Sequence, residues 1–99
     1  MVYSVHAMPK ANAKFENHVE FLAQVSESAA EKLYDAFYEC QKKLSENPHL
    51  YPKYESEIGM NLKYMLFSKR YRIVFKIVED KVHIYDIQDC RQDTAQNLI

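Results

Sequence analysis

Residues 70–87, RYRIVFKIVEDKVHIYDI, predict two β-strands joined by a short turn. Side chains alternate between the two faces of a strand, and the large apolar side chains of the first strand all fall on one face. These side chains are Tyr71, Ile73, Phe75 and Ile77. Arg72 and Lys76 fall on the opposite face. The stretch therefore predicts a sheet with one apolar face for a core and one face that carries cations.

The expected turns decide which residues share the second face, because directly opposite residues lie on the same side of a sheet. A turn at Glu79–Asp80 gives the pairs Lys76 with His83, Val74 with Tyr85, and Arg72 with Ile87. A turn at Ser68–Lys69 pairs Met65 with Arg72 and brings Lys63 to the same side. The predicted polar face therefore consists of Lys63, Arg72, Lys76, His83 and Tyr85.

Two interpretations of this polar face stay open at this point. Antiparallel sheets commonly leave one face in contact with water, so the cations can belong to an ordinary solvated surface. Alternatively, the face binds an anionic partner, with cations for phosphate groups and an aromatic ring for stacking on bases.

The N-terminal half of the chain has helical periodicity. After a short strand over residues 2–8, Pro9 suits the first turn of a helix that runs to about residue 24. A second helix is expected up to Pro48, with Ser28 and Glu31 as a capping box at its start. Its buried stripe consists of Leu33, Ala36, Phe37, Cys40 and Leu44. Few polar residues separate the helices, which predicts an antiparallel helical hairpin.

A loop over residues 48–61 and a strand over residues 62–67 precede the two strands described first. The order β-α-α-β-β-β predicts an α+β fold, a small antiparallel sheet with a helical hairpin packed on one face. The N-terminal strand has to join that sheet, because a lone strand is not stable. A chain of 99 residues can bury one core, so we expect a single domain over residues 1–99.

The composition of the chain limits the classes of function that we expect for this protein. A net charge of −1 is not typical of a general nucleic-acid binder, although five cations and no acid occur from Gly59 to Val78. No apolar stretch is long enough to span a membrane, and two cysteines without a signal peptide predict a cytoplasmic protein with free thiols. The four histidines show no zinc-ligand spacing, and we expect neither a metal nor a cofactor.

Three segments resemble the RelE/ParE superfamily of bacterial toxins, which are often labelled plasmid stabilisation proteins. They are SAAEKLYDAFYECQKKLSENPHLYP, GMNLKYMLFSKRYRIVFKI and DKVHIYDIQDCRQD. The resemblance extends from Tyr3 to about Asp93, and the superfamily fold has the same β-α-α-β-β-β order. It implies the toxin of a type II toxin–antitoxin module, a growth inhibitor that a small cognate antitoxin wraps and neutralises. The oligomeric state is left open, with a homodimer among the alternatives.

The superfamily has two main activities. For one of them, the resemblance indicates which residues of this chain match the catalytic positions of the family. RelE-like members cut mRNA in the ribosomal A site, and Lys63, Arg72 and Arg91 match catalytic cations of that branch. Lys76, His83 and Tyr85 are further candidates for binding RNA or phosphate. However, Met65 replaces another catalytic lysine of that branch, and no tyrosine follows Tyr85. These departures favour the ParE-like activity, inhibition of DNA gyrase. An inactive module that only binds the antitoxin is the third alternative.

Overall fold

The computed structural model describes residues 2–54 and 61–89. Their elements follow the predicted order with two short additions, a 3₁₀ helix and a two-residue strand inside the expected loop. The elements are β1 (Ser4–Ala7), α1 (Pro9–Val25), α2 (Glu27–Glu46), η1 (Pro48–Leu50), β2 (Lys53–Tyr54), β3 (Leu62–Phe67), β4 (Tyr71–Val78) and β5 (Lys81–Asp89).

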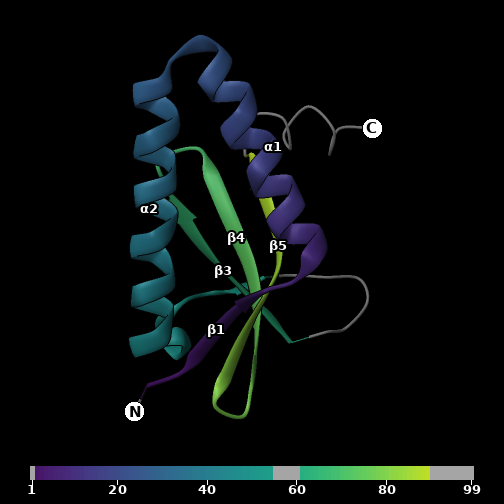
Figure 1. Ribbon diagram of the computed structural model, residues 1–99. Helices are drawn as coiled ribbons and strands as arrows, with labels where there is room; N and C mark the ends of the chain where they lie inside the picture. The colour runs from purple at the N-terminus through teal and green to yellow at the C-terminus, as the bar shows by residue number, and fades with distance from the viewer. Residues whose placement is uncertain (1, 55–60, 90–99) are drawn as a thin grey trace.

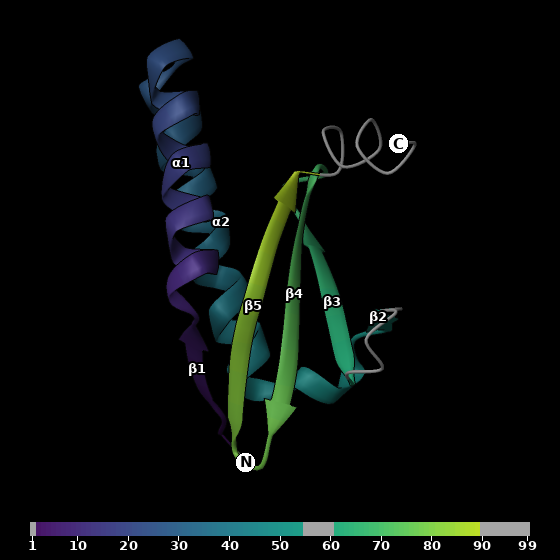
Figure 2. The same cartoon turned by 90° about the vertical axis from the view of Figure 1, so that its right-hand side faces the viewer.

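The strands form one sheet in the order β1-β5-β4-β3-β2, and the two helices cover one of its faces (Figures 1 and 2). The α+β fold with a helical hairpin on one face is therefore confirmed. The sheet is mixed rather than antiparallel throughout, because β1 pairs in parallel with β5. A parallel partner requires a crossover connection, and here the chain passes through the helical hairpin and then through β2, β3 and β4 before it reaches β5.

A single residue, Ser26, connects the two helices. It ends α1, where its backbone N–H donates to the carbonyl of Leu22. It also begins α2, where its hydroxyl accepts a hydrogen bond from the Ala29 N–H at 3.2 Å. The expected capping box at Ser28 and Glu31 is therefore wrong. The cap lies two residues earlier because a one-residue connection leaves Ser26 as the last non-helical residue before α2.

The core lies between the hairpin and the apolar face of the sheet. The expected stripe of α2 is confirmed, with Leu33, Phe37, Cys40 and Leu44 buried and Ala36 partly buried. Phe15 of α1 stacks on Phe37 with their ring centroids 4.1 Å apart. From the sheet, β4 and β5 contribute the most deeply buried side chains: Ile73, Phe75, Val82, Ile84 and Ile87.

The turn between β3 and β4 is one residue longer than expected. The extra residue exchanges the two faces of β3, so that the side chains expected on the polar face lie on the helix-facing side. The turn comprises residues 68–70, with positive φ at Ser68 (51°) and Lys69 (65°). Met65 consequently pairs with Ile73 and not with Arg72. A slip of one residue moves every side chain of a strand to the other face. The longer turn places Met65 and Phe67 in the core, which favours this register.

The register of β4 and β5 is as expected near their turn and differs beyond a β-bulge. Lys76 pairs with His83, but Val74 pairs with Asp86 and Arg72 with Gln88, because Tyr85 has no opposite residue. In a regular strand, Asp86 would follow Val82 and Ile84 on the core face. The extra residue places Ile87 there instead, and Ile87 is completely buried. Burial of an apolar side chain in place of a carboxylate favours the bulge.

Candidate functional site

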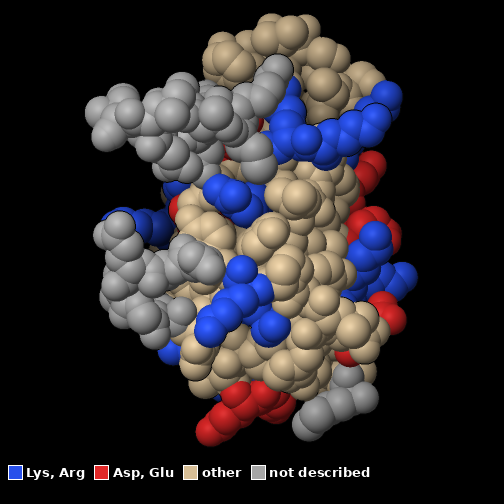
Figure 3. Space-filling view, turned by 180° about the vertical axis from the view of Figure 1, so that it is seen from behind, with Lys and Arg blue, Asp and Glu red and all other residues tan. Residues whose placement is uncertain are grey.

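The face of the sheet away from the helices carries three of the five predicted residues, Arg72, Lys76 and His83. Lys76 lies opposite His83, and the ring of His83 is 6.2 Å from that of His6 on the neighbouring β1. Tyr85 sits at the bulge and is partly exposed. Lys and Arg side chains form separate patches on this surface, and Asp and Glu lie mainly at its margins (Figure 3). We call this surface the open face.

Arg72 is held in place by polar and aromatic contacts on the open face. Its Nε donates a hydrogen bond of 2.8 Å to Oε1 of Gln88. Its guanidinium carbon lies 5.4 Å from the ring centroid of Tyr54 and 5.9 Å from that of Tyr64, within cation–π distance. Gln88 is oriented in turn by donating from Nε2 to the Tyr54 hydroxyl at 3.3 Å. These contacts preorganise the arginine.

A chain of hydrogen bonds links Arg72 to the helical layer. Nε2 of Gln88 also donates to Oδ2 of Asp86 at 3.1 Å. The other oxygen of Asp86 forms an ion pair of 2.6 Å with Nζ of Lys14 in α1, and it accepts from the Ile87 N–H at 2.9 Å. The carboxylate of Asp86 is thus compensated by Lys14. We call Arg72, Gln88, Asp86 and Lys14 the arginine network.

The sequence analysis missed most of the arginine network, because its members depend on the bulge and on the packing of α1. In the register expected without the bulge, Arg72 lies opposite Ile87 and has no amide partner. The break in alternation between Ile84 and Ile87 is the one signal in the sequence that indicates the bulge.

The placement of Lys63 on the polar face is wrong. Lys63 pairs with the core residue Phe75, so it lies on the helix-facing side of the sheet, and its Nζ donates to the carbonyl of Tyr51 at 2.9 Å. The three-residue turn before β4 is the cause, since it turns β3 over. The structure therefore does not bring Lys63 and Arg72 together. Arg91, the third catalytic candidate, lies outside the described residues.

A second ionic cluster lies next to the arginine network, at the end of β4 and β5 away from their connecting turn, and it is partly buried beneath α1. Arg70 forms an ion pair of 3.2 Å with the buried carboxylate of Asp89. Its guanidinium carbon also lies 5.0 Å from the ring centroid of Tyr71, against which His18 of α1 packs edge-on. Burial lowers the pKa of His18, although the nearby charge of Asp89 acts in the opposite direction. The cluster anchors α1 to the sheet.

The described residues offer little for covalent or metal chemistry. Burial raises the pKa of the Cys40 thiol to about 11, so this cysteine is a core side chain and not a nucleophile. Across residues 2–54 and 61–89, no group of three or more His, Cys, Asp or Glu side chains is arranged to hold a metal ion. Within these ranges, no helix has the length and apolar character needed to span a bilayer. Recognition through Arg72 is the chemistry that the open face supports best.

Comparison with known proteins agrees with this fold. The family model described as the ParE toxin of the type II toxin–antitoxin system, parDE, matches residues 5–94. A solved structure titled as the chromosomal ParDE TA system from P. aeruginosa has the same fold, with a TM-score of 0.72 and 16% sequence identity. The alignment covers 89% of this chain and 96% of that chain. A comparison with curated protein sequences gives no match. The family match extends over most of the chain, and the protein therefore belongs to the ParE toxins of type II toxin–antitoxin systems.

Proposed function

We propose that this toxin inhibits growth by binding DNA gyrase and that its open face contacts the enzyme. The position of Lys63 is the observation that carries the choice between the two activities of the superfamily. Ribonucleolytic catalysis requires cations converging on one phosphate, together with groups that move protons. Lys63 is on the opposite side of the sheet from Arg72 and is bound to the Tyr51 carbonyl. This arrangement argues against a ribonuclease site built on that pair.

The open face has the character of a protein-binding surface. Arginine and tyrosine are enriched among the residues that dominate binding energies, because they offer large contact areas together with specific polar groups. Arg72, flanked by Tyr54 and Tyr64, combines both kinds of residue. Because its conformation is already constrained in the free toxin, binding would cost less side-chain entropy. A carboxylate on the target is the group that such an arginine recognises most strongly.

The target is tested by pulse-labelling bacteria after induction of the toxin without its antitoxin. Incorporation of thymidine should fall before incorporation of amino acids, and the purified toxin should inhibit DNA supercoiling by gyrase. An earlier fall in protein synthesis would instead support the mRNA endoribonuclease. If neither rate falls, the chain is an inactive module that binds the antitoxin.

The role of Arg72 is tested against Lys63 as a matched cation on the opposite face. Arg72→Ala should weaken inhibition of gyrase at least about thirtyfold, the effect of losing roughly 2 kcal/mol at a binding hot spot. Lys63→Ala should retain most of the inhibition. Circular dichroism and thermal unfolding would show that both variants are folded. Equal losses in the two variants, or full activity of folded Arg72→Ala, would contradict the assignment.

A further inference from the structure

Two histidine side chains meet on the open face, in the part nearer the β4–β5 turn. His6 in β1 pairs with His83 in β5 in the parallel register, so both side chains lie on the same face of the sheet. Their ring centroids are 6.2 Å apart. His6 is exposed and His83 is partly exposed, so a ligand from solvent can reach both rings. The fold thus brings together two imidazoles from opposite ends of the sequence.

Neighbouring imidazoles form a chelating pair for divalent transition metals. Imidazole nitrogen is a ligand that suits zinc, copper and nickel ions. A zinc ion bonded to two imidazoles at about 2.0–2.1 Å and at the tetrahedral angle would hold their ring centroids roughly 5 Å apart. The observed separation is 6.2 Å, and rotation about the terminal torsion of the histidine side chain, which is broad, can close a difference of about 1 Å.

The nitrogens of the two rings are available to a metal ion. Among residues 2–54 and 61–89, no hydrogen bond or ion pair involves the side chain of His6 or His83. Arg72 differs in this respect, because its guanidinium group is held by Gln88 and two tyrosine rings. A metal ion can therefore bind the two histidines without breaking a polar contact that the structure describes.

The charges around the pair limit how tightly a cation binds. Lys76 on β4 lies beside His83, on the side away from β1. Lys81 precedes His83 by two residues and shares its face of the strand. Both ammonium groups repel a metal ion, but their long flexible side chains can turn toward solvent. Glu79 and Asp80, in the adjoining turn, carry charge of the opposite sign. We therefore expect weaker binding than at a site with three or four protein ligands.

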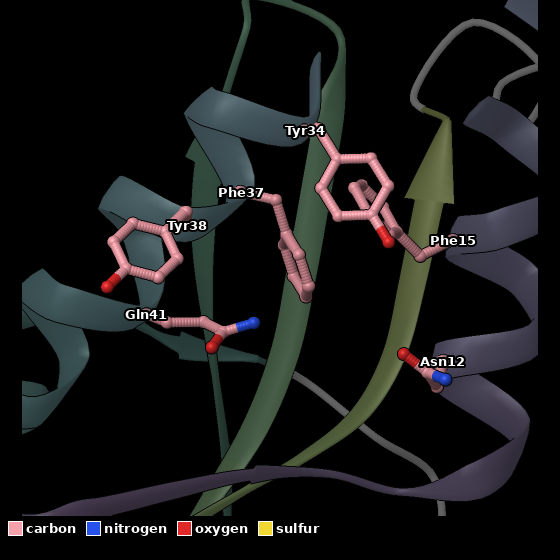
Figure 4. A pocket seen from close by; sticks show the side chains of 6 residues that line it. All are labelled: Asn12, Phe15, Tyr34, Phe37, Tyr38 and Gln41. Atoms are coloured by element: carbon pink, nitrogen blue, oxygen red, sulfur yellow. The ribbon is translucent and has the colours of Figure 1, made fainter. Parts of the chain in front are cut away.

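The two histidines are distinct from the rest of the described structure in this property. In the described ranges, they form the one pair of neighbouring histidine rings, whereas the rings of His18 and His49 pack against tyrosines. The pocket between the two helices is lined by four aromatic rings and two amides, and none of these is an imidazole or thiolate ligand for zinc (Figure 4). A paired set of zinc ligands therefore occurs on the open face and not in this pocket.

We propose that His6 and His83 bind one divalent transition metal ion, Zn²⁺, as a two-point chelate that fastens β1 to β5. The remaining coordination positions of the ion are open to water. The pair forms only when β1 has joined the sheet, so the ion binds the folded chain and stabilises it. The ion also closes a long loop of the chain, which increases its stabilising effect. The inference depends on neither the gyrase target nor the antitoxin.

The test titrates Zn²⁺ into the purified full-length protein, without an affinity tag, and measures binding by calorimetry. One ion should bind per chain, and Cu²⁺ should bind more tightly than Zn²⁺. His6→Ala and His83→Ala should each weaken binding at least about tenfold, because a single imidazole lacks a second ligand held close by. His49→Ala removes an exposed histidine elsewhere and should bind like the wild type. Lys76→Gln removes a repelling charge and should bind more tightly.

Two further measurements identify the ligands. Electron paramagnetic resonance of the protein loaded with Cu²⁺ should show two nitrogen ligands in the wild type and one in either His6→Ala or His83→Ala. Zn²⁺ should raise the midpoint of thermal unfolding of the wild type and of His49→Ala, and it should have little effect on the two variants of the pair. Circular dichroism without metal would show that all the variants are folded.

Three outcomes would overturn the inference. The first is a wild-type protein that does not bind Zn²⁺ at millimolar concentration. The second is unchanged affinity in both His6→Ala and His83→Ala, since the ion would then be held elsewhere on the chain. The third is equal weakening by His49→Ala. None of these measurements uses inhibition of gyrase, so the result for the metal site is independent of the proposed function.

Discussion

His18 shows how a single residue links stability to pH. It is partly buried against Tyr71, and burial lowers its pKa from 6.5. The charge of Asp89 and a hydrogen bond that His18 donates to the backbone of Ile87 act to raise the pKa, whereas Lys14 and Arg70 act with burial to lower it. The folded state therefore binds this proton less readily than the unfolded chain. The stability contributed by neutral His18 is complete above the unfolded pKa and is lost as pH falls through the folded pKa.

We therefore predict that the free energy of unfolding decreases as pH falls from 7.5 to 5.5. The slope due to His18 cannot exceed about 1.4 kcal/mol per pH unit, the limit for one proton. Urea denaturation at a series of pH values measures this dependence of the free energy of unfolding on pH. His18→Gln should flatten the dependence, because its side chain does not titrate. An unchanged slope in this variant would show that other groups cause the pH dependence.

At the scale of elements, Ser26 has a role that its neighbours do not share. It closes α1 and caps α2, so both helices depend on its position. Ser26→Ala should lower the free energy of unfolding by about 0.5–2 kcal/mol, the range for loss of an N-cap hydroxyl. Ser28→Ala is the matched control, because Ser28 is exposed in the first turn of α2 and should change stability by less than about 0.5 kcal/mol. Chemical denaturation measures both losses. A larger loss for Ser28→Ala than for Ser26→Ala would show that the cap of α2 is at Ser28.

At the scale of the whole molecule, β1 forms one edge of the sheet and holds the N-terminal segment against β5. Its backbone is tied to both layers, since the N–H of Tyr3 donates to Ser45 of α2 and that of Ser4 donates to Asp80 beside β5. Val5 pairs with Val82, whose side chain is completely buried. Loss of β1 would expose both the edge of β5 and the core beneath it.

We predict that deletion of residues 2–7 removes most of the roughly 5–15 kcal/mol by which a domain of this kind is stable. Thermal unfolding followed by circular dichroism should show a strongly lowered midpoint or no cooperative transition. Val2→Ala provides the control, because Val2 is 78% exposed and should unfold like the wild type. A deletion variant with an unchanged midpoint would mean that β5 does not need its parallel partner.

The elements that the sequence predicted correctly are those with a clear hydrophobic period. The stripe from Leu33 to Leu44 and the alternation from Tyr71 to Ile77 both appear in the structure as buried faces. Errors occur where pairing depends on one residue more or less, because turn length is weakly encoded when glycine and asparagine are absent. Ser68 and Lys69 adopt positive φ without being glycine. The resulting three-residue turn places Lys63 on the opposite face of the sheet from the one predicted.

The sequence by itself determined the class of fold, the hairpin, the core stripe and the placement of Arg72 opposite an apolar face, since these follow from local periodicity. The resemblance to the superfamily was also contained in the sequence, and the family match confirms it. Only the tertiary structure decided the parallel pairing of β1, the bulge at Tyr85 and the contacts that Arg72 makes. The bulge depends on burying Ile87 in place of Asp86, and the network around Arg72 depends on the contact between Lys14 and Asp86, which are 72 positions apart in the sequence. Such comparisons depend on contacts between distant segments, which no local pattern contains.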